Sequence, residues 1–215
     1  MSLLHCLKYL KKDEFGQAVR EYFNKEFSYA FIRAPASIHH HRNYEGGLLE
    51  HCIDVYSRYR CLLGVSNIPT FESDCMATAL LHDVSKVFMY MQEYAPKPTI
   101  SATYENHSSF PAIDFCAKTG VALPDDINSI ILSHMGPWAE DKHHPTKPLE
   151  ILFYTADHMS AVMNPPVNGS LWTLNNSFDV IEPKAIKLKG RSRNKNGRWR
   201  KKRNDAGTHR GVVFE

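Results

Sequence analysis

The chain has 215 residues, of which 43% are hydrophobic and 23% are charged, a composition typical of a folded globular protein. No apolar run reaches the roughly 18 residues of a membrane helix, and the N-terminus lacks the apolar stretch of a secretory signal. The five cysteines form no CxxC pair, which argues against a disulfide framework and a cysteine zinc site. We therefore expect a cytoplasmic protein with reduced thiols and no membrane contact.

Charge is distributed unevenly along the chain. Residues 1–183 carry 14 basic and 21 acidic residues, whereas residues 184–210 carry 12 basic residues against the single acidic Asp205. Such a density of cations attracts the phosphate backbone of nucleic acids. We expect this C-terminal segment to contact a nucleic acid. The alternative is a solvated tail without a specific partner.

Apolar residues recur at helical spacing through most of the chain and predict an all-α fold. Beyond residue 164 this spacing is lost, and alternation around Asn196-Gly197 predicts either a two-stranded hairpin or a disordered segment. In chain order, the expected helices cover residues 2–27 (one helix or two), 48–63 (ended by Gly64), 73–92, 104–118, 125–135 (capped by Asp125 and Asp126) and 149–163.

Four of these helices place an imidazole or a carboxylate among apolar neighbours. Asp157 lies in LEILFYTADHMSA, and His134 follows three isoleucines at helical spacing, so both side chains are expected to point inward. His51 and the pair His82-Asp83 adjoin apolar runs as well. For any one of them, a structural histidine bonded to a backbone carbonyl is the commoner case. Together they favour a metal site with imidazole and carboxylate ligands.

The order His51, His82-Asp83, Asp157 resembles the H…HD…D signature of HD-domain metal-dependent phosphohydrolases. The segments YEGGLLEHCIDV, ALLHDVSK, ILSHMGPW and PLEILFYTADHMSA are similar, in order and spacing, to the HD domain of bacterial 3′-to-5′ exoribonucleases. The segment PASIHHHRNYEGGLLEH also resembles the HD domain of a class of conjugative relaxases. The resemblance covers residues 34–163 and implies an HD-domain helical bundle there. Residues 1–33 would then be a helical segment packing on this core, and residues 164–215 a basic extension.

The resemblance also implies a ligand set for divalent metal ions, expected to be two and drawn from Mn, Fe, Ni, Co, Zn and Mg. The sequence around His107 departs from the family pattern, because Asn106 stands where a glycine often precedes this histidine. The first ion would be held by His51, His82, Asp83 and Asp157, and the second by Asp83, His107 and His134.

Other residues are assigned roles beside these ligands. Asp83 would bridge the ions and orient the attacking water, and Lys86, one helical turn later, would bind a phosphate oxygen. A solvated lysine is the alternative for Lys86. The resemblance places His40 or His41 at the pocket mouth, in contact with phosphate or base, with a solvated loop as the alternative.

These observations predict a metal-dependent phosphohydrolase, that is, a phosphodiesterase, nucleotidase or exonuclease. It would use metal-activated water to cleave phosphoester bonds of a nucleotide or of single-stranded nucleic-acid 3′ ends. The alternatives are an HD-fold nicking or processing factor of the relaxase type and a non-catalytic nucleic-acid-binding module. The complete ligand set argues against the last. The oligomeric state does not follow from the sequence.

Overall fold

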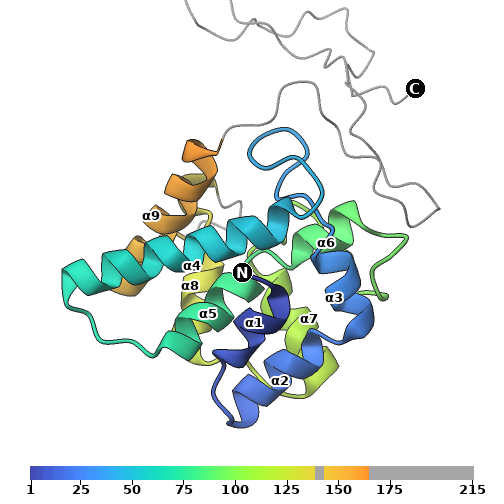
Figure 1. The fold of residues 1–215 in the computed structure, drawn as a ribbon, viewed down its shortest axis with the longest axis horizontal. Helices are drawn as coiled ribbons and strands as arrows, with labels where there is room; N and C mark the ends of the chain where they lie inside the picture. The colour runs from blue at the N-terminus through green and yellow to red at the C-terminus, as the bar shows by residue number, and fades with distance from the viewer. Residues whose placement is uncertain (139–142, 165–215) are drawn as a thin grey trace, which may run out of the picture. The chain divides into compact units, whose positions relative to one another are not determined.

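The structure is a computed structural model that describes residues 1–138 and 143–164. All regular secondary structure in these residues is helical, which confirms the predicted all-α fold class (Figure 1). The predicted hairpin or disordered segment of the extension lies outside the described residues. Among the described helices, none is long and apolar enough to cross a membrane. In chain order they are α1 (Leu3–Lys8), α2 (Glu14–Tyr22), α3 (Lys25–Phe31), α4 (Gly47–Ser66), α5 (Glu72–Leu81), α6 (Ser85–Tyr90), α7 (Phe110–Thr119), α8 (Asp125–Ser133), the 3-10 turn η1 (Gly136–Trp138) and α9 (Pro148–Met163).

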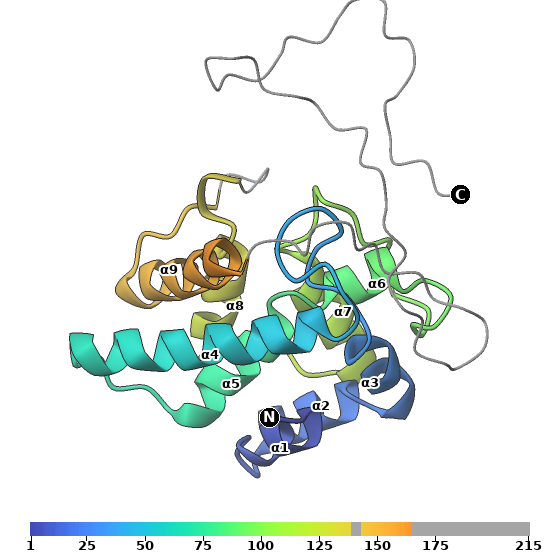
Figure 2. The same cartoon turned by 45° about the horizontal axis from the view of Figure 1, so that its top comes forward.

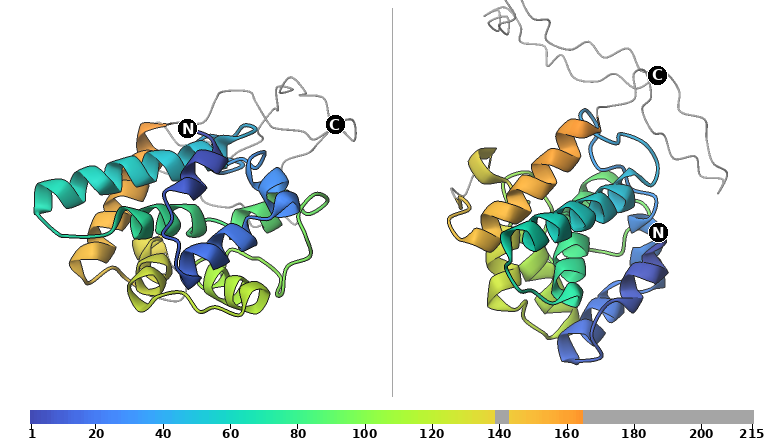
Figure 3. Two further views of the ribbon diagram at one scale, coloured as in Figure 1. Left: turned by 60° about the horizontal axis from the view of Figure 1, so that its bottom comes forward. Right: turned by 60° about the vertical axis from the view of Figure 1, so that its left-hand side comes forward.

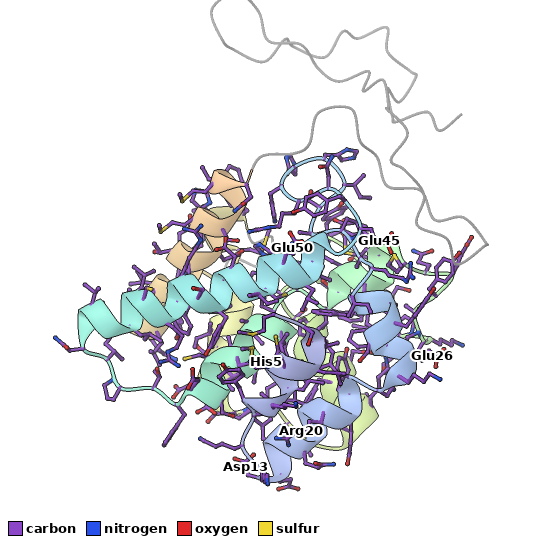
Figure 4. The ribbon with its side chains drawn as sticks, viewed as in Figure 1. His5, Asp13, Arg20, Glu26, Glu45 and Glu50 are labelled. Atoms are coloured by element: carbon purple, nitrogen blue, oxygen red, sulfur yellow. The ribbon has the colours of Figure 1, made fainter. Side chains whose placement is uncertain are left out.

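The N-terminal segment forms three short helices, so the prediction of one or two is wrong. Asp13 and Asn24 interrupt the helical pattern, because each side chain caps a new helix by accepting the backbone N–H three residues later, at 2.8 and 2.9 Å. Arg20 of α2 donates to the Lys11 carbonyl at 3.0 Å and so ties α2 to the chain after α1; Asp13 and Arg20 are labelled in Figure 4. Helix α2 in turn packs on α5 and α7.

Helices α4, α5, α8 and α9 form the part of the core that carries the site. Helix α4 packs on both α9 and α5, and α8 packs on the same two helices (Figures 2 and 3). At the centre, the rings of Tyr59 (α4) and Phe153 (α9) meet edge to face with 5.1 Å between centroids. The ring of His82 lies 5.4 Å from Phe153. The apolar core therefore reaches directly to an imidazole at the end of α5.

Two predicted helix ends differ from the structure. Helix α4 continues through Gly64 to Ser66 and ends where Asn67 adopts a left-handed conformation with φ 54°. Gly64 is exposed and a Cβ there would contact nothing, so the helix tolerates it. Asp125 and Asp126 do not cap α8: Pro124 is the N-cap, and the two carboxylates lie in the first turn, where they favour the positive end of the helix dipole.

Two predicted helices are also interrupted or shortened. The expected helix over residues 73–92 is broken between Leu81 and Ser85, which separates α5 from α6. The expected helix over residues 104–118 begins only at Phe110, so that His107 lies in the turn before α7. Both departures concern residues of the predicted metal site.

A loop over residues 32–46 leads into α4 and is held by close backbone contacts. Arg42 has a positive φ of 42°, and its carbonyl accepts the N–H of Ala36 at 3.1 Å, which closes the loop at its base. A Cβ on Gly47 would lie 2.1 Å from the Arg42 carbonyl oxygen, so only glycine permits this approach. The loop therefore presents His39, His40 and His41 from a fixed base.

Candidate metal centre

The four predicted ligands of the first ion converge from two helices and from the turn that separates two others. His51 lies in α4, Asp157 in α9, and His82 and Asp83 at the break between α5 and α6. The Nε2 atoms of His51 and His82 each lie 3.3 Å from Asp83 Oδ2. The same two nitrogens lie 3.0 and 3.9 Å from Asp157 Oδ1. Each of the two imidazole nitrogens thus lies within 4 Å of an oxygen of both carboxylates.

A second group meets at the other oxygen of Asp83. His107 Nε2 lies 3.0 Å and His134 Nε2 3.8 Å from Asp83 Oδ1, and the two nitrogens are 3.3 Å apart. The four histidines of the two groups, His51, His82, His107 and His134, are all buried. Asp83 is therefore shared, with each carboxylate oxygen turned toward a different histidine pair.

The break between α5 and α6 allows His82 and Asp83 to serve the same site. Consecutive residues in a continuous helix point about 100° apart and do not face each other. Here α5 ends at Leu81, and tight backbone bonds follow, from Lys86 N to the Asp83 carbonyl at 3.0 Å and from Val87 N to the Val84 carbonyl at 3.1 Å. The turn brings the Asp83 carboxylate beside the His82 ring.

Hydrogen bonds at the far side of each ring fix which nitrogen faces the centre. His82 Nδ1 lies 2.8 Å from the Ala79 carbonyl, and His134 Nδ1 lies 2.5 Å from the Ile131 carbonyl. Because a carbonyl only accepts, both Nδ1 atoms carry the hydrogen and both Nε2 atoms keep a lone pair. His51 Nδ1 lies 3.1 Å from Ser160 Oγ and His107 Nδ1 contacts Ser85 Oγ, so both rings also turn Nε2 inward.

The donor set fits divalent metal ions. The Nε2 atoms of His51 and His82 are buried and have no hydrogen-bond partner within the described structure. The ligand atoms of His51, His82 and Asp83 lie within 4.8 Å of one another, as do those of Asp83, His107 and His134. Buried imidazole and carboxylate donors with outer hydrogen bonds are the arrangement that metal sites require. These groups can therefore bind metal.

Charge within the centre favours the ligand forms of these side chains. Burial raises the pKa of Asp83, but the adjacent His82 ring, the Lys86 ammonium and the close approach of His107 and His134 outweigh this effect and hold this pKa well below its usual range. Burial lowers the pKa of His107 to about 4, against the opposing effect of Asp83. Asp83 is therefore ionised and His107 neutral at physiological pH.

Lys86 belongs to the centre, and the alternative of a solvated surface lysine is wrong. Its Nζ lies 2.6 Å from Asp83 Oδ2, and its side chain is only 15% exposed. Burial lowers the pKa of Lys86, but the nearby carboxylates Asp83 and Asp157 raise it by more, so it stays charged. A fixed cation thus lies beside the shared carboxylate.

A cavity of about 550 Å³ opens onto these residues. Asp83, His107, His134 and Asp157 line it, as do His40 and His41 of the loop over residues 32–46. His40 is exposed, as a solvated loop predicts, but His41 has a buried Nε2 without a hydrogen-bond partner, and its ring lies 4.8 Å from that of His51. Burial, with Lys86 and His51 nearby, lowers the pKa of His41 to about 3, so its ring is neutral. The solvated-loop alternative is therefore wrong for His41.

Sequence reasoning missed the residues that support the ligands. Ser160 follows Asp157 by three residues on α9, a spacing that indicates a shared helix face, yet a serine alone carries little signal. Arg42, which donates to Ser160, is 118 positions away and no local pattern connects the two. Asn106 does not adopt a positive φ, so its replacement of a glycine costs the backbone nothing.

Comparison with known proteins identifies one informative relative. The chain is similar to dihydroneopterin 2′,3′-cyclic phosphate phosphodiesterase from Methanocaldococcus jannaschii, with 31% identity over 130 residues. The match covers 56% of this chain and 47% of that protein, so the chain spans about half the length of the relative. No family model matches the chain, and no solved structure matches it at a significant level. The resemblance to exoribonucleases and relaxases stays a prediction.

Proposed function

We propose that this chain is a metal-dependent phosphodiesterase of the HD phosphohydrolase type, which cleaves a phosphoester bond of a small, nucleotide-like substrate. The observation that carries the proposal is the shared Asp83, whose two oxygens face two histidine pairs next to a cavity of about 550 Å³. A cavity of this size suits a small organic ligand. The name of the similar archaeal protein, a cyclic phosphate phosphodiesterase, supports the same reaction class.

The chain's own residues supply binding and orientation in this proposal. His51, His82, Asp83 and Asp157 would hold one divalent ion, and Asp83, His107 and His134 the other. When bound, the ions would neutralise the phosphoryl oxygens and lower the pKa of an attacking water.

Two further side chains would contact the phosphate. Lys86 would place its charge beside a phosphoryl oxygen, since its ammonium already lies against the acidic centre. His41, neutral and with a buried Nε2 that has no hydrogen-bond partner within the described residues, would hydrogen-bond an oxygen of the substrate.

The test is an assay of the full chain, loaded in turn with Mn²⁺, Fe²⁺, Co²⁺, Ni²⁺, Zn²⁺ or Mg²⁺. Substrates are bis(p-nitrophenyl) phosphate, p-nitrophenyl phosphate and nucleoside 2′,3′-cyclic phosphates. We expect hydrolysis of the diesters that a chelator abolishes. Diester hydrolysis that persists after complete metal removal, or none with any metal, would overturn the proposal.

A second candidate substrate is the 3′ end of single-stranded RNA or DNA, favoured by the 12 basic residues of segment 184–210. Replacing Lys201, Lys202 and Arg203 with glutamine in the full chain removes three of these charges. If the segment binds the strand, oligonucleotide affinity falls and its salt dependence flattens, because each neutralised phosphate contributes nearly one to the slope of log affinity against log salt. Hydrolysis of a cyclic mononucleotide should not change.

A further inference from the structure

The cavity beside the metal centre has walls built from two helical faces. On α6 and the turn before it, the residues that line the cavity recur at helical spacing after Asp83, and those on α9 recur around Asp157. Each helix therefore contributes one stripe of cavity-lining residues that includes or adjoins an acidic ligand. The stripes are Lys86, Met89 and Tyr90 on α6, and Tyr154, His158 and Ala161 on α9.

Aromatic side chains gather on both walls. On the α6 side, the hydroxyl groups of Tyr90 and Tyr104 lie 3.3 Å apart. On the α9 side, the Tyr154 ring is stacked on the His158 ring, with 5.8 Å between centroids and 21° between planes. Both pairs line the cavity, so two flat, partly polar surfaces border the same space.

The turn η1 extends the α9 wall. Gly136 packs so closely on Tyr154 that a Cβ at this position would lie 2.5 Å from the ring, and its φ of 54° is strained for other residues. Two residues later, Trp138 lines the cavity with 71% of its surface exposed. A large indole that remains uncovered beside a pocket is available to stack on a ligand.

Fixed charge in the cavity is confined to its inner end. Among the described residues that line it, Asp83 and Asp157 are the carboxylates and Lys86 is the single lysine or arginine. One phosphate can be neutralised by Lys86 and the metal ions. A second phosphate, placed farther out, would meet aromatic rings and imidazoles with no further fixed cation from these residues.

We infer that the cavity takes a phosphoester with a single phosphate group joined to one planar heteroaromatic ring, held between the Tyr90–Tyr104 and Tyr154–Trp138 walls. This inference rests on the proposed function and specifies its substrate class. Tyr90 follows Lys86 by four residues, which displaces it about 6 Å along the helix from the phosphate end. That offset leaves room for a sugar or short linker between phosphate and ring. Stacking on aromatic side chains would hold the ring without selecting a particular base.

The first experiment compares three substrates of the metal-loaded full chain: adenosine 2′,3′-cyclic phosphate, the same compound with a 5′-phosphate, and glycerol 1,2-cyclic phosphate. Because stacking contributes about 1–3 kcal/mol per base, we expect kcat/KM to fall about 5- to 150-fold when the ring is absent. We also expect the added 5′-phosphate to lower kcat/KM. Preference for the 5′-phosphorylated compound would overturn the single-phosphate part.

The second experiment uses matched variants of the walls. Tyr154→Leu and Tyr90→Leu remove the rings, whereas Tyr154→Phe and Tyr90→Phe keep them. The leucine variants should raise KM for the adenosine compound more than for the glycerol compound, and the phenylalanine variants should stay within a few-fold of the original protein. Tyr9→Leu alters a tyrosine of the N-terminal segment that does not line the cavity. It should leave KM unchanged for both the adenosine and the glycerol compound. Circular dichroism checks that each variant is folded.

Calorimetric binding of adenosine 2′-monophosphate gives a readout independent of turnover. We expect it to weaken in both leucine variants and to persist in both phenylalanine variants. If glycerol 1,2-cyclic phosphate is cleaved as well as the adenosine compound and the leucine variants bind the nucleotide normally, the inference fails while the proposed function stands. If no diester is cleaved, the proposed function fails, and the calorimetry alone decides whether the walls bind a ring.

Discussion

Arg42 donates from Nη1 to Ser160 Oγ at 2.8 Å, although the two residues are 118 positions apart in the chain. The same serine oxygen lies 3.1 Å from His51 Nδ1, and Arg42 Nη2 forms an ion pair with Asp54 at 3.0 Å. Arg42 is 7% exposed, so these contacts are largely shielded from water. Arg42 therefore connects the loop over residues 32–46, α4 and α9 directly behind a proposed metal ligand.

Ser160→Ala should weaken metal binding without removing a ligand. The variant loses the hydroxyl that orients the His51 ring, and loss of such an outer hydrogen bond costs about 10- to 100-fold in metal affinity. Competition with a chromophoric chelator measures this affinity. The control is Thr155→Ala on the same helix, whose hydroxyl donates only to the Ile151 carbonyl. Equal affinity in the two variants would show that Ser160 does not position His51.

Asp83→Ala should abolish hydrolysis while the protein stays largely helical. The shared carboxylate faces both histidine pairs, so both ions lose a ligand, whereas the apolar packing of α4, α5, α8 and α9 is untouched. Metal analysis, a rate assay and circular dichroism test this together. Asp74→Ala, at the first turn of α5 and away from the cavity, is the control. A variant that retains both its metal and its rate would show that the centre is misassigned.

His107→Ala and His134→Ala should each lower the metal content from about two ions per chain toward one, with a large fall in turnover. The remaining group of His51, His82, Asp83 and Asp157 should still bind its ion. Mass spectrometry of the intact protein under native conditions counts the ions. His5→Ala, an exposed histidine of α1, serves as control. If the unmodified protein never binds more than one ion, the second site does not exist.

Glu150→Gln should lower the free energy of unfolding at neutral pH. It should also reduce the loss of this free energy when the pH falls. Glu150 is 4% exposed and accepts hydrogen bonds from the Ser129 hydroxyl and from the backbone N–H groups of Thr146 and Lys147 at 2.8 and 3.0 Å. Burial raises the pKa of Glu150, but these bonds outweigh it and lower this pKa from the ordinary 4.5 to about 2.

A depressed pKa stabilises the folded state above the pKa of the unfolded chain, and this contribution disappears as the pH falls from about 5 toward about 2. We therefore expect Glu150→Gln to cost about 1.5–3 kcal/mol at pH 7 and much less near pH 2. Urea unfolding at several pH values measures the difference. Glu26→Gln, which changes an exposed carboxylate of α3, should show no such dependence. If Glu150→Gln lowered the free energy of unfolding equally at pH 7 and near pH 2, the stabilisation would not come from the ionised Glu150 carboxylate.

The spacing of apolar residues within single helices explains why the sequence predicts the buried positions of His134 and Asp157. The three isoleucines before His134 place its ring inside, and the apolar neighbours of Asp157 place that carboxylate near the core, because a helix face is set by residues three and four apart. The break between Leu81 and Ser85 had no such signal, since apolar spacing runs through it without a glycine or proline. No local sequence pattern links Arg42, Tyr104 or Trp138 to the ligands, because only the folded chain brings them to the site.

Lys86 has a consequence for the protein before any ion is bound. Its ammonium, 2.6 Å from Asp83 Oδ2, acts as an internal counterion and keeps Asp83 deprotonated without a metal. An arriving divalent ion therefore exchanges one cation for another at this oxygen and need not displace a proton from it. The apo-protein can thus fold with Asp83 already paired to a cation, and metal loading at Asp83 should release few protons at neutral pH.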